Sequence, residues 1–435
     1  MLNELSKNVI TEYFYRLRFS LKTGSDRMTP ENFQSRLDEE SSIIIRKILN
    51  KSYKFSRYNK FIVKKNRLVY SPTVRDRIVL DMLNDKIIKK YKIKFPNRDC
   101  ICEGIKRTLE AGFNFTVIRL DIENFYPSIP HNLLYNKLKS SSLLSETEYL
   151  LVKRAFCQEN KGVLQGLPIS NSLAEIYLER LDSKLKAIDS RLCYFSRYVD
   201  DIILIFNTHL LNSEINNIYI KVDEVLSNLK LALNREKSCH KLLNDKSSFE
   251  YLGYNFILFK DRFPNNGKKS YNRVELEISQ KKINQIKEKI SKYFYDYSIN
   301  NNFNLLYERL KFITSKCYGL KFKQCSRNGD VDSYTKKIYF GIYESYSFAN
   351  QESFNLINSH IKAMIKMNFI NFNNKQRKML FNCSYNKQKP HYINYHKFTN
   401  IDYLNIIQKI NPTYIVPTNQ KRHAVIYDYF KLLDI

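Results

Sequence analysis

The chain has 435 residues, enough for two or three domains, and 43% of them are hydrophobic, so a substantial core can form. Lysine and arginine outnumber aspartate and glutamate by 72 to 43, giving a formal net charge of +29. Because this excess is spread from end to end, nucleic acid is the expected partner, although a lysine-rich compositional bias would give the same charge. The sequence also lacks the usual features of a secreted or membrane protein. Residues 1–5 lack a signal-peptide core, no apolar run approaches the ~20 residues of a membrane span, and the eight cysteines are scattered. We therefore expect a soluble, cytoplasmic protein with reduced thiols and no membrane partner.

Periodicity and turn residues predict a mixture of helices and short antiparallel strands. In the first part of the chain, the sequence predicts helices over 10–21 and 30–49, a strand pair over 61–72 and a helix over 75–91. A buried strand over 115–122 follows, then a helix from about 130, a helix from Gly166 to about 187, a hairpin over 192–206 and a helix over 213–230. The last predicted elements are a hairpin over 248–260 and a mostly helical, basic region after 278. Thr29 and Pro30 are good N-cap and first-turn residues for the second helix. The segment 261–275 is the best candidate for a domain boundary.

Two adjacent carboxylates lie at the tip of the hairpin over 192–206, in Tyr198-Val199-Asp200-Asp201. Adjacent acids repel, and a divalent cation is one way to neutralise them; an isolated pair of this kind is more often a solvated acidic turn. Asp121, about 80 residues earlier, ends the buried strand. An acid at a strand end together with an acidic hairpin is what a two-metal polymerase needs, because two Mg²⁺ ions about 4 Å apart clamp the attacking and leaving oxygens of a phosphoryl transfer.

Seven ordered motifs between about residues 20 and 260 resemble those of reverse transcriptases. They are Thr23-Gly24-Ser25-Asp26-Arg27-Met28-Thr29, Lys65-Asn66-Arg67 with Ser71-Pro72-Thr73-Val74-Arg75, Leu120-Asp121-Ile122 with Phe125-Tyr126-Pro127, Gln165-Gly166-Leu167-Pro168-Ile169-Ser170, Arg197-Tyr198-Val199-Asp200-Asp201, Leu233-Asn234-Arg235-Glu236-Lys237 and Phe249-Glu250-Tyr251-Leu252-Gly253. Each motif alone is modest, but their order makes the resemblance specific.

The resemblance implies a right-hand polymerase of the α+β class. Residues 1–114 would be an N-terminal extension and fingers, residues 115–262 a palm with antiparallel sheet, and residues 263–435 an α-helical thumb with an RNA-binding C-terminal region. The cofactor would be two Mg²⁺ ions, with Mn²⁺ as a substitute.

The same resemblance assigns roles to individual residues. Asp121 and Asp200 would bind the metals, with Asp201 as a third ligand or a hydrogen-bonding neighbour and the Ile122 carbonyl completing one shell. Lys237 would be the general acid for pyrophosphate release. The substrate-binding residues would be Lys65, Arg67, Tyr126, Gln165, Gly166 and Tyr198. Lys65 and Arg67 would grip the triphosphate, and the Tyr126 ring would exclude a 2′-hydroxyl, so that dNTPs are the substrate. Gln165 and Gly166 would lie beside the nascent base pair, where glycine permits close backbone approach.

The region after residue 260 resembles that of defence-associated (abortive-infection and unknown-group) bacterial enzymes in residues 277–282, 306–314 and 339–346. That resemblance implies an enzyme that synthesises DNA in defence against bacteriophage, with a cognate noncoding RNA as its template. The primer would be a 3′-hydroxyl or a protein hydroxyl, and the enzyme would act as a homo-oligomer or with a partner reverse transcriptase. The alternatives are a group II intron-like or retron-like retroelement enzyme and a non-catalytic RNA-binding protein on a polymerase scaffold.

Overall fold

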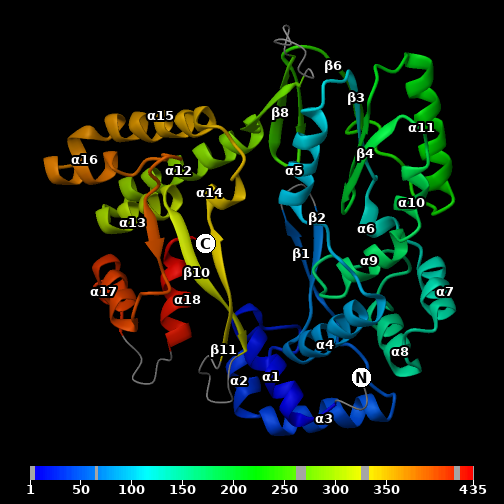
Figure 1. The fold of residues 1–435 in the computed structure, drawn as a ribbon. Helices are drawn as coiled ribbons and strands as arrows, with labels where there is room; N and C mark the ends of the chain where they lie inside the picture. The colour runs from blue at the N-terminus through cyan, green and yellow to red at the C-terminus, as the bar shows by residue number, and fades with distance from the viewer. Residues whose placement is uncertain (1–4, 64–66, 261–270, 325–332, 416–421, 435) are drawn as a thin grey trace. The chain divides into compact units, whose positions relative to one another are not determined.

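The computed structural model describes residues 5–63, 67–260, 271–324, 333–415 and 422–434 (Figure 1). The chain divides into two compact units. The first unit consists of residues 1–245 and 260–272, and the second consists of residues 246–259 and 273–435. The hairpin over 248–260, which the sequence analysis grouped with the palm, therefore packs with the C-terminal region.

The first unit mixes helices with short strands. Its elements are α1 (Lys7–Leu17), η2 (Arg18–Ser20), α2 (Pro30–Ser35), α3 (Leu37–Leu49), β1 (Asn59–Val63), β2 (Arg67–Ser71), α4 (Val74–Tyr91), α5 (Arg98–Leu109), β3 (Phe115–Asp121), α6 (Phe125–Ser128), α7 (His131–Ser141), α8 (Glu146–Ala155), α9 (Ser170–Leu178), α10 (Leu181–Lys186), β4 (Leu192–Tyr198), β5 (Asp201–Phe206), α11 (Asn212–Ser227) and β6 (Cys239–Leu243). The α+β fold class with antiparallel sheets is confirmed.

The start of α2 follows the sequence prediction, but the helix does not run on to residue 49. The Thr29 hydroxyl accepts a hydrogen bond from the Asn32 backbone N–H at 3.2 Å, and Pro30 is the first helical residue. At Arg36 the backbone leaves helical geometry, with φ −113° and ψ 22°, and α3 begins at the next residue. The expected single helix is therefore two helices.

A four-stranded sheet, in the order β4-β5-β3-β6, forms the core of the first unit. All its strand pairs are antiparallel. β3 and β5 are buried along nearly their whole length, and because successive residues of a strand point to opposite faces, both faces of the central strands are covered. β4 shows what covers its two faces. The Tyr194 hydroxyl donates to the Ile101 carbonyl of α5, whereas Arg197, on the opposite face, binds Asp182 of α10.

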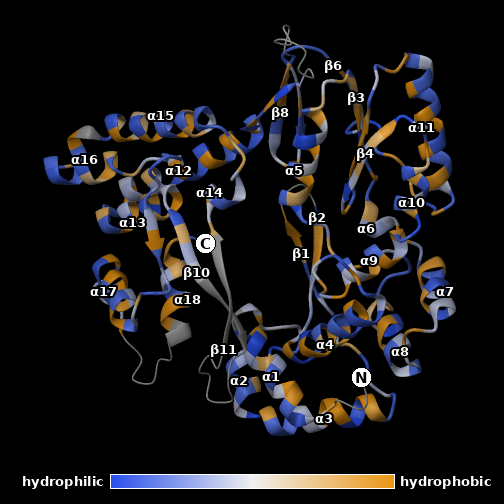
Figure 2. Cartoon of the chain, viewed as in Figure 1, coloured by the Kyte–Doolittle hydropathy of each residue, from blue (hydrophilic) through white to orange (hydrophobic). Residues whose placement is uncertain are grey.

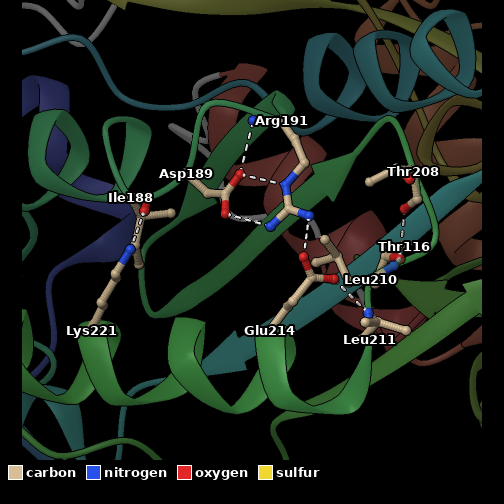
Figure 3. Close-up of polar contacts among 9 residues, drawn as sticks. All are labelled: Thr116, Ile188, Asp189, Arg191, Thr208, Leu210, Leu211, Glu214 and Lys221. Carbon is tan, nitrogen blue, oxygen red and sulfur yellow. Dashed lines mark hydrogen bonds and ion pairs between the residues drawn. The ribbon is translucent and has the colours of Figure 1, made fainter.

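The ends of this sheet are tied to α11 by a group of polar contacts (Figure 3). Arg191, which precedes β4, binds Asp189 at 2.9 Å and Glu214 of α11 at 2.5 Å. The Glu214 carboxylate also accepts a hydrogen bond from the Leu211 backbone N–H at the start of the helix. These contacts fix the entry of α11 relative to β4.

The strands β1 and β2 form a separate two-stranded ribbon with an exposed apolar surface. They pair antiparallel, with Phe61 opposite Val69 and Ile62 opposite Leu68. Both strands are largely hydrophobic in Figure 2, yet the Ile62 side chain is 75% exposed. An exposed apolar ribbon of this kind is typical of a binding surface.

The second unit contains two small sheets and a set of helices. Its elements are β7 (Ser247–Tyr251), β8 (Tyr254–Phe259), β9 (Arg273–Ile278), α12 (Gln280–Asn300), α13 (Phe303–Thr314), β10 (Lys316–Gln324), β11 (Ser333–Phe340), α14 (Ile342–Ser345), α15 (Gln351–Met367), η4 (Phe369–Asn371), α16 (Asn374–Phe381), β12 (Tyr392–Asn394), α17 (Asn400–Ile410) and α18 (Arg422–Leu432). The sheets have the orders β7-β8-β9 and β11-β10-β12.

The region after residue 278 is mostly helical, as expected, but it also contains strands that the sequence analysis did not foresee. β10 pairs with β11 in antiparallel fashion and with β12 in parallel fashion. Within the described residues, no helix is both long enough and apolar enough to cross a membrane.

Candidate active site

The sheet brings the predicted acids of the first unit together. Asp121, the last residue of β3, is directly opposite Asp201, the first residue of β5. Paired residues of an antiparallel sheet lie on the same face, so these two side chains are neighbours. Asp200 precedes β5 in the turn, and its carbonyl accepts a hydrogen bond from the Ile122 backbone N–H at 3.3 Å. All three predicted carboxylates therefore gather at one end of the sheet.

The turn that carries Asp200 has an unusual backbone. Tyr198 pairs with Asp201, which leaves Val199 and Asp200 as the two central residues. Val199 has φ 60°, in the left-handed region that β-branched residues avoid. A positive φ at the first central position is typical of a type II′ turn, which normally has glycine there. Such strain costs about 1–3 kcal/mol and persists only where the surroundings hold the backbone in place.

Two cations bind the acids on this face. The Arg119 guanidinium donates to the Asp201 carboxylate at 2.8 Å. The Lys237 ammonium lies 3.2 Å from Asp121 Oδ2, while its own side chain is mostly exposed. Lys237 thus lies among the acids, as the sequence analysis expected, although its role as a general acid stays a prediction.

The surroundings of Asp200 disfavour its ionised form. Burial raises the pKa of the Asp200 carboxyl above its ordinary value, and the charges of Asp201 and Asp121 raise it further. A raised pKa means that the ionised form lacks sufficient positive charge around it, even with Lys237 nearby. The site therefore favours an added cation.

The donor set fits a divalent metal held partly by substrate. The described residues contain no group of three His, Cys, Asp or Glu side chains arranged to hold a metal alone. Asp121 and Asp200 are the nearest oxygen donors; Arg119 binds Asp201, and Lys237 contacts one oxygen of Asp121, Oδ2. Mg²⁺ is commonly held by one or two carboxylates together with water and phosphate oxygens, so two donors are sufficient. The Ile122 backbone forms a bridge to Leu233 beside these acids.

Tyr126 lies near the acids, at the start of α6. Its hydroxyl donates to Asn171 Oδ1 of α9 at 2.8 Å, and its ring packs against Phe125 with the centroids 5.3 Å apart. Burial raises the pKa of Tyr126 to about 12, with further contributions from the charges of Asp200 and Glu175. The hydrogen bond to Asn171 fixes the direction of the ring.

The predicted nucleotide-binding residues lie on neighbouring segments, with one exception. Lys65 falls outside the described residues. Arg67 is the first residue of β2. Its positive charge lowers the pKa of Tyr126, whereas the charges of Asp200 and Glu175 raise it, which indicates that the Arg67 guanidinium is close enough to act on this site. Tyr198 ends β4 directly before the strained turn.

Gln165 and Gly166 pack against β2. The Tyr70 backbone N–H donates to the Gln165 carbonyl at 2.8 Å. Gly166 has φ +99°, and a Cβ atom there would meet the Tyr70 carbonyl oxygen and would lie 2.7 Å from Val69. The close approach that glycine permits is therefore to the protein's own strand. Proximity to a base pair stays a prediction.

Arg197 forms a buried ion-pair network beneath the turn. Its side chain is 6% exposed and binds Glu175 of α9 at 2.8 Å and Asp182 of α10 at 2.7 Å. Burial lowers the pKa of Arg197, but the hydrogen bonds and charges of the two carboxylates outweigh burial and raise it. One guanidinium nitrogen also donates to the Val199 carbonyl at 3.1 Å.

The roles of Arg119 and Arg197 were not predicted from the sequence. A signal for Arg119 was present, because it is the one charged residue inside the buried run that ends at Asp121. Arg197 was noted as part of a motif, but only the fold shows that Glu175 and Asp182 approach it from two helices.

Comparison with known proteins is consistent with this geometry. Residues 50–256 match the family model described as "Reverse transcriptase (RNA-dependent DNA polymerase)". The matched segment contains all three acids and all the predicted nucleotide-binding residues. Residues 50–256 are thus similar to a reverse transcriptase domain.

The similar proteins share low sequence identity with this chain. A Saccharomyces cerevisiae protein named "Putative COX1/OXI3 intron 2 protein" is 23% identical over an alignment of 245 residues, and the match covers 41% of this chain and 28% of the yeast protein. Among solved structures, the telomerase of Candida albicans with a TWJ fragment of telomeric RNA matches with a TM-score of 0.40 and 12% identity, over 93% of this chain and 64% of that one. Apo telomerase from Candida tropicalis matches with a TM-score of 0.35 and 14% identity, over 54% and 61%. This chain thus spans about a quarter of the yeast protein and less than two thirds of either telomerase chain.

Proposed function

We propose that this chain is an RNA-directed DNA polymerase that adds dNTPs to a primer hydroxyl by a two-metal mechanism. The observation that carries the proposal is the meeting of Asp121, Asp200 and Asp201 at one end of the sheet, inside the reverse transcriptase domain. A solvated acidic turn would not bring a third carboxylate from another strand to the same point.

The chain's own residues prepare this reaction. Asp121 and Asp200 supply carboxylate oxygens for two Mg²⁺ ions, with Mn²⁺ as a substitute, and Arg119 holds Asp201 beside them. When bound, these ions activate the primer hydroxyl and neutralise charge on the triphosphate. Lys237, with an exposed ammonium near Asp121, can donate a proton to the departing pyrophosphate.

The remaining contacts orient the nucleotide. The Tyr126 ring, whose hydroxyl is bound to Asn171, would exclude a 2′-hydroxyl from the substrate. Arg67 brings positive charge toward the same site, and a guanidinium suits phosphate oxygens. The exposed apolar surface of β1 and β2 offers a contact for the bases.

The test is DNA synthesis by the purified full chain on an oligo(dT)-primed poly(rA) template with Mg²⁺ and dTTP. We expect synthesis by the wild-type protein and a loss of at least about 100-fold in Asp200→Asn, since the metals supply several kcal/mol of transition-state stabilisation. Asp99→Asn, in the first turn of α5, is the matched control and should retain activity. Equal activity of wild type and Asp200→Asn would contradict the assignment. Inactivity of the wild type, with RNA still bound, would favour the non-catalytic RNA-binding alternative.

For the biological role, we propose antiphage defence in the cytoplasm, with a cognate noncoding RNA as template and primer hydroxyls from nucleic acid or protein. The support is the resemblance of residues 277–282, 306–314 and 339–346 to defence-associated enzymes, together with the net charge of +29. A homo-oligomer or a partner enzyme belongs to the same proposal. The seven cysteines within the described residues are all free, which fits a reducing compartment.

The alternative is a retroelement enzyme, and one observation favours it. The curated relative is named as an intron protein, although it shares 23% identity with this chain. Sequencing the RNA that co-purifies with the protein during phage infection distinguishes the two roles. A structured noncoding RNA encoded beside the gene supports defence, whereas an intron or retron RNA supports the alternative.

A further inference from the structure

The network around Arg197 reaches the backbone of the turn that carries Asp200. Arg197 and Asp200 belong to the same hairpin, but Arg197 lies on the sheet face that packs against α9 and α10. By strand alternation, Tyr198 and its partner Asp201 point to the opposite face. Arg197 therefore has no direct access to a substrate at the acids. The contact that links Arg197 to the turn carrying Asp200 is its hydrogen bond to the Val199 carbonyl.

A second arginine of the same hairpin provides an internal comparison (Figure 3). Arg191 also binds two carboxylates, those of Asp189 and Glu214. It lies at the far end of β4, where Leu192 pairs with Phe206. The two arginines thus have similar ion pairs, but Arg197 is 6% exposed and also donates to the strained turn, whereas Arg191 is 36% exposed.

We propose that Arg197 is a positioning residue. The carboxylates of Glu175 and Asp182 hold its guanidinium in place, and the guanidinium in turn holds the Val199 carbonyl so that Asp200 faces Asp121. The inference deepens the proposed polymerase function and rests on it. The physical reason is the backbone of Val199. Its φ of 60° is unfavourable for valine, so the turn keeps this conformation only while something outside it fixes the backbone.

The guanidinium suits this task because of its shape. Its planar fork binds Glu175 through two nitrogens and Asp182 through two, and one of these nitrogens also reaches the carbonyl. Lysine would keep the positive charge, but its single ammonium cannot reproduce this fork. A lysine substitution therefore tests geometry with charge held constant.

The experiment compares Arg197→Lys with Arg191→Lys in the full chain. Steady-state kinetics on primed poly(rA) would give kcat and KM for dTTP, and hydrogen–deuterium exchange would report on the amides of residues 198–202. We expect Arg197→Lys to lower kcat on the order of 10–100-fold with little change in KM, because small misplacements of catalytic groups have effects of that size. Exchange at the turn should rise. Arg191→Lys should leave both readouts near wild type.

Glu175→Gln provides a milder variant in case Arg197→Lys folds poorly, because it keeps Arg197 and an acceptor oxygen. It should lower kcat less and raise exchange at the same residues, whereas the matched Glu214→Gln should not. Unchanged kcat and exchange in the folded Arg197→Lys protein would overturn the inference, as would an equal loss in Arg191→Lys. If the wild-type protein makes no DNA, the proposed function fails, and the exchange comparison by itself still decides whether Arg197 holds the turn.

Discussion

At the scale of single residues, two contacts set the orientation of Tyr126. Its hydroxyl is bound by Asn171 and its ring is packed against Phe125, so the ring cannot turn freely. A fixed ring discriminates by shape. Removing the ring opens space for a 2′-hydroxyl, whereas removing the hydroxyl alone keeps the ring and removes only its hydrogen bond to Asn171.

Tyr126→Ala should therefore admit ribonucleotides. We expect the ratio of kcat/KM for dTTP over UTP to fall on the order of 10–100-fold, the range that small steric differences in a pocket provide. Tyr126→Phe, which keeps the ring and loses the hydrogen bond, is the matched control and should stay within a few-fold of wild type. Single-nucleotide incorporation assays measure both ratios. An unchanged ratio in Tyr126→Ala would remove the ring from the selection of the sugar.

At the scale of elements, the contact between Gly166 and β2 joins two motifs that are about 100 residues apart in the chain. Gly166 and Gly341 have nearly the same positive φ, +99° and +96°, but their surroundings differ. A Cβ on Gly166 would collide with the β2 backbone. A Cβ on Gly341 would lie 3.7 Å from the Ser315 carbonyl, an ordinary contact.

This pair separates backbone strain from collision. Gly341→Ala should lower the free energy of unfolding by about 1 kcal/mol from strain alone, and Gly166→Ala by about 2–3 kcal/mol because the strand must also shift. Urea denaturation, followed for the unit that carries each substitution, measures the two values. Equal losses would show that β2 moves away from the loop at no cost.

The elements also show what a sequence can and cannot predict. The hairpin of β4 and β5 and the strand ending at Asp121 follow from short apolar runs flanked by acids, and all three were predicted from local pattern. The break at Arg36 and the positive φ of Val199 were not, because neither residue type favours its observed backbone. The hydrogen bonds of Arg36 join it to residues within four positions, and the Val199 carbonyl accepts from Arg197, which is itself held by Glu175 and Asp182 of two helices.

The strands β10 and β11 were missed for a different reason. Lysines and tyrosines are abundant throughout the C-terminal region, so the alternation within 316–324 was hidden among similar helical segments. In the site, the acids could be predicted from motifs. The partners Asn171, Glu175 and Asp182 could not, because each comes from a helix with no motif of its own at that position.

At the scale of the whole molecule, charge is the dominant property. In the second unit, the helices α12 and α15 pack against one another. Their exposed lysines include Lys281 of α12 and Lys362 and Lys366 of α15. A basic surface of this kind binds phosphates mainly by releasing counterions, so its affinity for nucleic acid should depend strongly on salt.

RNA binding should weaken steeply with ionic strength. For a single-stranded 20-nucleotide RNA, we expect the affinity to fall at least about 100-fold between 50 and 200 mM salt, as for a protein with about six phosphate contacts. The double substitution Lys362→Ala with Lys366→Ala should reduce the slope of log K against log salt by about 0.7 per lost contact. Lys184→Ala, an exposed lysine of α10, should leave it unchanged. Fluorescence anisotropy titrations measure the slope, and a slope near zero would contradict an electrostatic RNA surface.

The interleaving of the two units has a consequence for biosynthesis. Residues 246–259 leave the ribosome before residues 260–272, which complete the first unit by contacts such as those of Asn272 with the carbonyls of Leu109 and Ala111. β8 has only β7 beside it until β9 follows from residue 273. During that interval β8 offers an open strand edge, which is prone to pair with other nascent chains. A fragment ending at residue 256, where the match to the reverse transcriptase family ends, would be cut within β8 and would make that transient exposure permanent.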